Sequence, residues 1–83
     1  MNNREKYDAA FIETLVVEAK DLPALKYQDI PTWDSVGHMA LMAALEEAFD
    51  IELDTDDIIE FSSYEAGQAI LAKYHVDIDP ASA

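Results

Sequence analysis

The chain has 83 residues, of which 18 are Asp or Glu and 5 are Lys or Arg, so its formal net charge is −13. Because 51% of the residues are hydrophobic, the chain can bury one small core, which argues against a disordered acidic polypeptide. A charge this negative disfavours nucleic acid and anionic membrane surfaces as partners and favours basic proteins.

The chain contains no cysteine, which excludes a disulfide framework, a thiolate metal site and a thiol nucleophile. No segment approaches the roughly 18 apolar residues of a membrane span, and no apolar run follows the N-terminus. We therefore expect a soluble, unprocessed, cytoplasmic monomer. Residues 1–75 are expected to form one domain, and residues 76–83 a flexible C-terminal tail.

The first predicted element is an amphipathic helix at about residues 4–19. Its apolar residues recur at helical spacing on one side, namely Phe11, Ile12, Leu15 and Ala19. Residues 20–34 contain two prolines and lose this period, so they are predicted to form a loop. Four apolar residues of this loop are expected to pack onto the core: Leu22, Leu25, Tyr27 and Ile30.

A second helix is predicted to begin at Asp34 or Ser35, because both are favourable N-cap residues. About four helical turns follow, to Phe49. At about 100° per residue, one side of this helix is apolar and is predicted to face the core. That side holds Leu41, Met42, Leu45 and Phe49. The opposite side holds Val36, Met39, Glu46 and Glu47.

A short helix is predicted at residues 56–60, with Ile58, Ile59 and Phe61 pointing inward. Ser62 or Ser63 is then expected to cap a last helix. This helix has an apolar stripe at spacings of three and four, made of Tyr64, Gly67, Ile70, Leu71 and Tyr74. The predicted fold is all-α, a small four-helix bundle of three longer helices and one short helix.

The acidic residues gather in one part of the chain. Between Lys26 and Lys73 there are eleven Asp or Glu residues and no Lys or Arg. Clustered charge usually means a solvated face that keeps a protein soluble. However, Val36 and Met39 lie on the acidic side of the second helix, and apolar contacts ringed by carboxylates suit a docking surface for basic partners.

The acidic run at residues 50–57 places carboxylates at alternate positions, as a calcium-binding loop does. It lacks the glycine that such a loop needs at its sixth position, where Thr55 stands, and the glutamate at its twelfth, where Phe61 stands. We therefore predict no specific metal site.

Ser35 allows three interpretations. As a nucleophile it has Asp34 and His38 close in sequence, but the Gly-x-Ser-x-Gly elbow is missing and His38 falls on the core side of its helix, where a half-buried histidine bonded to the loop is expected. As the first residue of a helix, Ser35 can instead carry a phosphate that the helix dipole stabilises. The third interpretation is an N-cap without further function. His75 carries no functional signal.

The motif Asp34-Ser35-Val36, followed by the stretch at residues 44–53 (ALEEAFDIEL), resembles the acyl carrier protein family. The resemblance covers residues 7–74 and includes the acidic balance, the size and the four-helix layout. It implies that Ser35 is esterified by the 4′-phosphopantetheine of coenzyme A through a phosphopantetheinyl transferase that uses Mg²⁺. It also implies that Asp34 lies beside the phosphate and supports this reaction.

The resemblance further implies a carrier that has no catalytic residues and takes an acyl or aminoacyl thioester to loading and transferring enzymes with basic patches. The second helix would dock these enzymes through Val36, Met39, Glu46 and Glu47. Cargo would lie between the second and third helices, against Met42, Leu45, Ile58 and Ile59, all of which are equally good core residues.

Two positions depart from the pattern of carriers for bulk fatty-acid synthesis, which have acids two and five residues after the serine. Gly37 and Ala40 stand there in this chain. The string from Trp33 to His38 instead resembles stand-alone carriers of specialised pathways. The alternative from another functional class is an unmodified acidic helical module that binds a basic protein, and a small hydrolase using Ser35 and His38 is the third.

Overall fold

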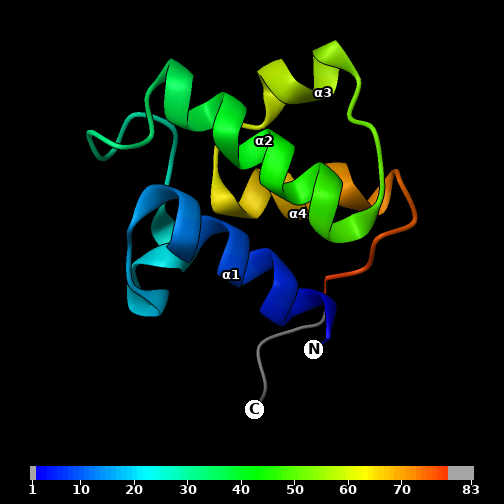
Figure 1. Cartoon of the computed structure of the whole chain (residues 1–83), viewed down its shortest axis with the longest axis horizontal. Helices are drawn as coiled ribbons and strands as arrows, with labels where there is room; N and C mark the ends of the chain where they lie inside the picture. The colour runs from blue at the N-terminus through cyan, green and yellow to red at the C-terminus, as the bar shows by residue number, and fades with distance from the viewer. Residues whose placement is uncertain (1, 79–83) are drawn as a thin grey trace.

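The computed structural model describes residues 2–78, and these fold as an all-α protein with five helical segments (Figure 1). In chain order the segments are α1 (Asn3–Leu15), the 3₁₀ helix η1 (Ala19–Ala24), α2 (Ser35–Phe49), α3 (Thr55–Glu60) and α4 (Tyr64–Ala72). The prediction of an all-α fold is confirmed for this part of the chain, which contains no strand but one isolated β-bridge between Lys26 and Ser63.

Helix α1 is shorter than predicted. It begins with a capping box, in which the Asn2 side chain accepts from the Glu5 amide and the Glu5 carboxylate accepts from the Asn2 amide. It ends at Leu15 because Val16 takes a left-handed conformation with a φ of 57°. The prediction that this helix extends to Ala19 is therefore wrong, since Ala19 begins η1 and is exposed.

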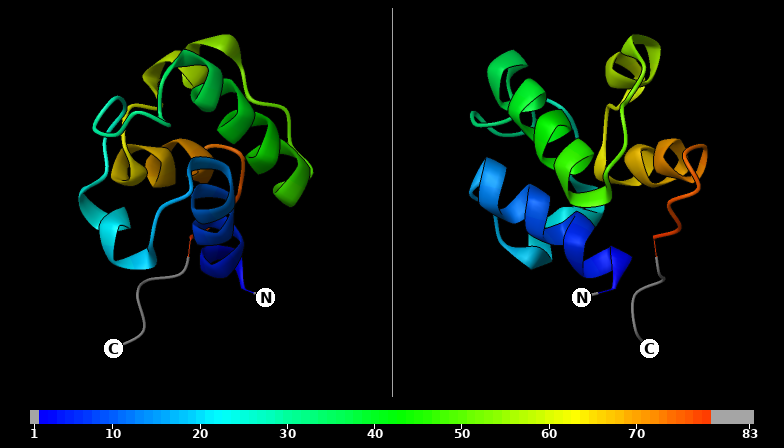
Figure 2. Two further views of the ribbon diagram at one scale, coloured as in Figure 1. Left: turned by 60° about the vertical axis from the view of Figure 1, so that its left-hand side comes forward. Right: turned by 45° about the vertical axis from the view of Figure 1, so that its right-hand side comes forward.

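Helix α2 runs beside α1 in the opposite direction, and the two helices pack against each other (Figures 1 and 2). Its N-cap is Asp34, and its C-cap is Asp50 in a left-handed conformation. Leu41, Met42 and Leu45 are buried and Phe49 is half-buried, which confirms the predicted core side.

The core is built around an aromatic cluster that joins α1 to two other parts of the chain, the loop before α2 and the start of α4. The ring of Phe11 lies 4.9 Å from Tyr7, 5.5 Å from Trp33 and 5.3 Å from Tyr64, between ring centroids. Such edge-to-face pairs each contribute about 1 kcal/mol beyond the burial of their area. As predicted, apolar residues of the 20–34 segment cover this core: Leu22 and Leu25 are buried, and Tyr27 and Ile30 are half-buried.

Helix α3 lies at the edge of the molecule, above α4 in Figure 1, and its register differs from the prediction. Phe61 is buried and Ile58 is half-buried, as expected, but Ile59 is 73% exposed. The prediction that Ile59 points inward is wrong because consecutive residues on a helix point about 100° apart. The buried residue on the other side of Ile58 is instead Asp57, which is 4% exposed.

Helix α4 is capped by Ser63, whose hydroxyl accepts from the Ala66 amide. After α4 the chain stays attached: Val76 is buried in the core, and the Asn3 side-chain amide donates to the carbonyl of Asp77 at 2.9 Å. The prediction that the flexible tail begins at Val76 is therefore wrong for residues 76–78, which are attached to the rest of the fold. The rest of the predicted tail, residues 79–83, lies outside the described residues.

Candidate functional site

Helix α2 is capped by Asp34 and not by Ser35. The Oδ1 atom of Asp34 accepts from the Gly37 amide at 2.8 Å, and the Asp34 carbonyl accepts from the His38 amide at 2.7 Å. Asp34 is therefore the N-cap, and Ser35 is the first helical residue and is exposed. The interpretation of Ser35 as a cap is wrong, since its neighbour performs that function.

The backbone before Ser35 is held tightly. The Thr32 hydroxyl donates to the Leu15 carbonyl at 2.7 Å, which fixes the loop to the end of α1. A Cβ atom on Gly37 would lie 1.9 Å from the Thr32 carbonyl oxygen, so only glycine permits this contact between α2 and the loop. Trp33, which follows Thr32, is fully buried. Ser35 is thus presented on a packed frame.

His38 is half-buried and uses both ring nitrogens in hydrogen bonds. The indole Nε1 of Trp33 donates to His38 Nδ1 at 2.9 Å, and His38 Nε2 lies 2.7 Å from the carbonyl oxygen of Ile58. Because an indole nitrogen only donates, Nδ1 must accept, and the proton of the neutral ring lies on Nε2, which donates to Ile58. The predicted contact with the loop is confirmed.

These contacts leave no ring nitrogen of His38 to accept a proton from Ser35. A serine nucleophile needs a general base within hydrogen-bond reach. The pair required by the hydrolase interpretation is not assembled.

An open cavity of about 340 Å³ lies beside Ser35. Its lining comes from α2, α3 and the two loops near them, and consists of Tyr27, Ser35, His38, Met39, Ile58, Ile59, Phe61 and Ser62. Two of the four predicted cargo residues, Ile58 and Ile59, line it. Met42 and Leu45 do not, because they are 1% and 0% exposed and belong to the core.

The sequence held a signal for part of this lining that our prediction did not use. Ser35, His38 and Met39 follow one another at spacings of three and four, which places them on one side of α2. Met39 was predicted only as a docking residue. The loop residues Tyr27 and Ser62 carry no such signal, because only the folded chain brings them to α2.

Val36 follows Ser35 in the chain, and two further exposed apolar residues, Met39 and Ile59, line the same cavity as Ser35. Val36 is 77% exposed and Met39 is 56% exposed, as predicted for the face opposite the core, and Ile59 of α3 joins them. We call Val36, Met39 and Ile59 the apolar rim. Single exposed apolar residues are ordinary, but three so close to one exposed serine mark a candidate contact surface.

The two predicted acidic docking residues differ in the structure. Glu47 is exposed, whereas Glu46 is half-buried and its Oε2 atom accepts from the Leu53 amide at 2.9 Å. The bond ties the loop after α2 back to that helix. Glu46 therefore stabilises the fold, and Glu47 is the member of the pair whose side chain faces solvent.

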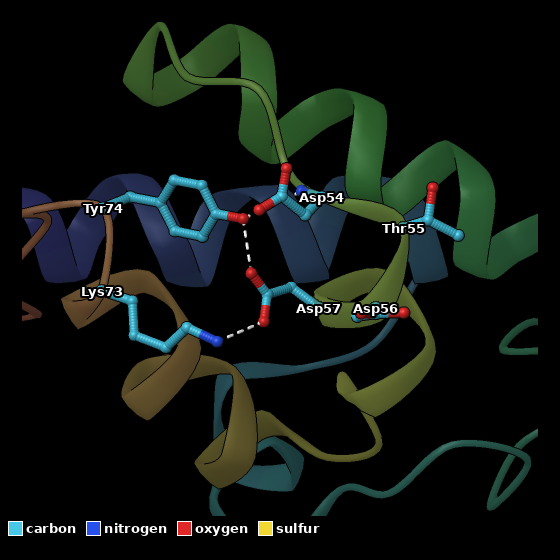
Figure 3. A pocket seen from close by; sticks show the side chains of 6 residues that line it. All are labelled: Asp54, Thr55, Asp56, Asp57, Lys73 and Tyr74. Carbon is cyan, nitrogen blue, oxygen red and sulfur yellow. Dashed lines mark hydrogen bonds and ion pairs between the residues drawn. The ribbon is translucent and has the colours of Figure 1, made fainter.

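A second cavity, of about 400 Å³, lies between α3 and the end of α4 and contains the buried carboxylate of Asp57 (Figure 3). Lys73 Nζ donates to Asp57 Oδ1 and the Tyr74 hydroxyl donates to Asp57 Oδ2, each at 2.5 Å. The hydrogen bond from Lys73 is the main cause that lowers the pKa of Asp57, and the same contact raises the pKa of Lys73. Both oxygens of the carboxylate are thus engaged within the protein, which makes this a structural contact.

The acidic run at residues 50–57 does not gather into a metal site. Asp50 caps α2, Asp54 precedes α3 and Asp57 is paired with Lys73. Among the described residues, no group of three or more His, Asp or Glu side chains could hold a metal ion. No helix within residues 2–78 is long and apolar enough to cross a membrane.

Comparisons of the chain with protein-family models, with curated proteins and with solved structures found no match. A functional interpretation therefore has to come from the geometry around Ser35 and from the motif that contains it.

Proposed function

We propose that the chain is a carrier protein of the acyl carrier type and that Ser35 bears 4′-phosphopantetheine. The observation that carries the proposal is that Asp34 caps α2 while Ser35 stays exposed beside an open apolar cavity. A serine with this placement contributes nothing evident to folding. The four-helix-bundle arrangement of this family is part of the proposal.

The start of α2 suits a phosphate on the Ser35 oxygen. The first amides of a helix have no acceptor within the helix, and of these Asp34 satisfies the one on Gly37. The amides of Ser35 and Val36 are left to donate to a phosphate, which the positive end of the dipole of this 15-residue helix also attracts. Asp34 stands beside this position and would help the transferase to place its Mg²⁺.

The cofactor would supply the thiol that the polypeptide lacks, on a flexible arm that carries an acyl or aminoacyl group as a thioester. The residues of the chain would bind and shelter the apolar part of that group, with Ile58 and Ile59 as walls of the cavity. On the α2 side of the cavity the wall would be Met39, and not Met42 and Leu45 as predicted.

Partner enzymes would dock on the same face. The apolar rim offers contacts that exclude water, and Glu47 with the other exposed acids of the region attracts basic patches and raises the association rate. Glu46 would act there through the loop that it holds. We propose a specialised pathway rather than bulk fatty-acid synthesis, because Gly37 and Ala40 replace two acids of that carrier type, and we expect a cytoplasmic monomer.

The test is to co-express the chain with a broad-specificity phosphopantetheinyl transferase and to weigh the intact protein. Wild type should gain the mass of one phosphopantetheine group, and Ser35→Ala should gain none. Ser62→Ala is the matched control, because Ser62 is also exposed and also lines the cavity, and it should be modified like wild type.

The second candidate is an unmodified module that binds a basic protein, and the apolar rim within an acidic region is the observation that favours it. An absence of mass gain in wild type, with a transferase shown to be active on another carrier, would reject the carrier and leave this module.

A further inference from the structure

Besides the packing of Ile58 against the core, helix α3 is held to the rest of the molecule by few side-chain hydrogen bonds. It has six residues and stands between two non-helical segments, residues 50–54 and 61–63. On one side Asp57 is bonded to Lys73 and Tyr74, as Figure 3 shows. On the other side the carbonyl oxygen of Ile58 accepts from His38. The second contact lies in the wall of the cavity beside Ser35.

His38 is well placed to fix α3, because its own ring is fixed. Nδ1 is bonded to Trp33, which is fully buried, and the His38 ring lies 5.2 Å from the Tyr27 ring and 6.2 Å from the Phe61 ring. The proton on Nε2 therefore points in a defined direction. The hydrogen bonds Trp33–His38 and His38–Ile58 thus connect α3 to the fixed loop before Ser35.

The position of α3 decides how large the cavity is. Met39 and His38 line it from α2, and Ile58 and Ile59 line it from α3, so separation of the two helices would widen it. Its volume of about 340 Å³ is near the lower end for small-molecule sites. Separation of the helices requires the bond between His38 and Ile58 to break.

We propose that His38 is a positioning residue that holds α3 against α2 and thereby restricts the cavity to short apolar acyl groups. This inference rests on the proposed function, because it names the class of cargo that the Ser35 arm shelters. A longer chain could be sheltered along its whole length only by displacing α3 and giving up the hydrogen bond from Nε2. Loss of one such bond changes an equilibrium by up to about tenfold.

The first experiment does not depend on the cofactor, since it uses the Ser35→Ala chain. Octanamide, a neutral probe, is titrated into this protein while the methyl signals of Met39, Ile58 and Ile59 are followed by NMR. The proposal expects saturable shifts at these methyls. It also expects binding about tenfold weaker when His38→Asn is added. An absence of shifts, or equal affinity with and without His38→Asn, would overturn it.

In the second experiment a broad-specificity phosphopantetheinyl transferase moves octanoyl- or hexadecanoyl-4′-phosphopantetheine from the corresponding acyl-coenzyme A to Ser35 of wild type, with release of adenosine 3′,5′-bisphosphate. Cleavage of the thioester by hydroxylamine is then measured. Octanoyl should be cleaved about tenfold more slowly than hexadecanoyl. Equal rates in wild type would contradict the proposal, whatever the variants do. If neither group can be loaded, it is the carrier function that fails, and the octanamide titration still decides the role of the cavity.

Two variants of His38 separate positioning from plain stability. Asn places its side-chain oxygen where Nδ1 accepts from Trp33 but cannot reach Ile58, whereas Gln places a donor near the position of Nε2. The ratio of octanoyl to hexadecanoyl protection should fall toward one in His38→Asn and persist in His38→Gln. Emission from Trp33, the only tryptophan in the chain, reports whether its environment is preserved. An unchanged ratio in His38→Asn would refute the role.

Discussion

Replacing Gly37 by alanine should destabilise the protein, although the same change usually strengthens a helix. The new Cβ atom would lie 1.9 Å from the Thr32 carbonyl oxygen, while carbon and oxygen normally approach no closer than about 3.3 Å. Helix and loop would thus have to separate by about 1.4 Å. Thr32 cannot retreat freely, because its hydroxyl is bonded to the carbonyl of Leu15.

The magnitude follows from two opposing effects. Overpacking of this kind costs about 1–3 kcal/mol, and the gain in helix propensity returns at most about 1 kcal/mol. The net loss in the free energy of unfolding should be up to about 2 kcal/mol, and each kcal/mol lowers the thermal midpoint of a domain this size by about 4–8 °C.

The assay is thermal unfolding followed by circular dichroism, with Ala40→Gly as the matched control. Ala40 is exposed on the same helix, so its replacement reports propensity alone. If propensity decided both positions, Gly37→Ala would raise the midpoint and Ala40→Gly would lower it. If packing decides Gly37, both midpoints fall. A higher midpoint for Gly37→Ala would refute the reasoning.

Three further predictions concern a strained residue, a buried acid and the acidic face. Val16→Gly should raise the free energy of unfolding by about 1 kcal/mol, because Val16 has a φ of 57° and is 80% exposed; a lower midpoint would show that no strain is stored there. Asp57→Asn should lower stability to urea at neutral pH. Because Lys73 lowers the pKa of Asp57, the stabilisation that the ionised carboxylate provides is complete above the ordinary aspartate pKa of about 3.9 and disappears as the pH falls through the lowered value. The stabilities of wild type and variant should therefore converge in acid. A difference that stays constant with pH would exclude the ion pair as the cause of the loss. Glu47→Lys should slow loading by the transferase at low salt without changing the thermal midpoint. Glu46→Lys should slow loading and also lower the free energy of unfolding by about 1 kcal/mol, because it loses the hydrogen bond from the Leu53 amide. Equal loading rates for Glu47→Lys and wild type would remove that face from the mechanism.

Sequence periodicity predicts best the helices that are long enough to repeat their apolar pattern over several turns. Helix α2 has its core side and its end at Phe49 where the sequence places them, because fifteen residues give several turns of apolar repeat. Helix α3 has six residues, and adjacent isoleucines at 58 and 59 fit an inward direction equally well. Only the partners of Asp57, which lie 16 and 17 residues away, settle which way the helix turns.

The end of α1 shows a different limit. Valine is an unfavourable residue for a left-handed cap, so nothing local indicates a stop at Val16. The stop depends on a tertiary contact, since the Thr32 hydroxyl satisfies the carbonyl of Leu15 from a loop 17 residues away. The same holds for the candidate site: Ser35 and Asp34 are visible as a motif, but the choice of Asp34 as the cap needs the backbone geometry.

The bond between Asn3 and Asp77 brings the two ends of the described chain together, on the side of the molecule away from the start of α2 (Figures 1 and 2). Neighbouring ends of this kind are what circular permutation and fusion to other proteins require. A permuted chain that joins them and opens elsewhere would leave Ser35 and the apolar rim intact. For the same reason, a tether at either end would present the Ser35 face outward, which suits surface-based measurement of how fast partner enzymes arrive and leave.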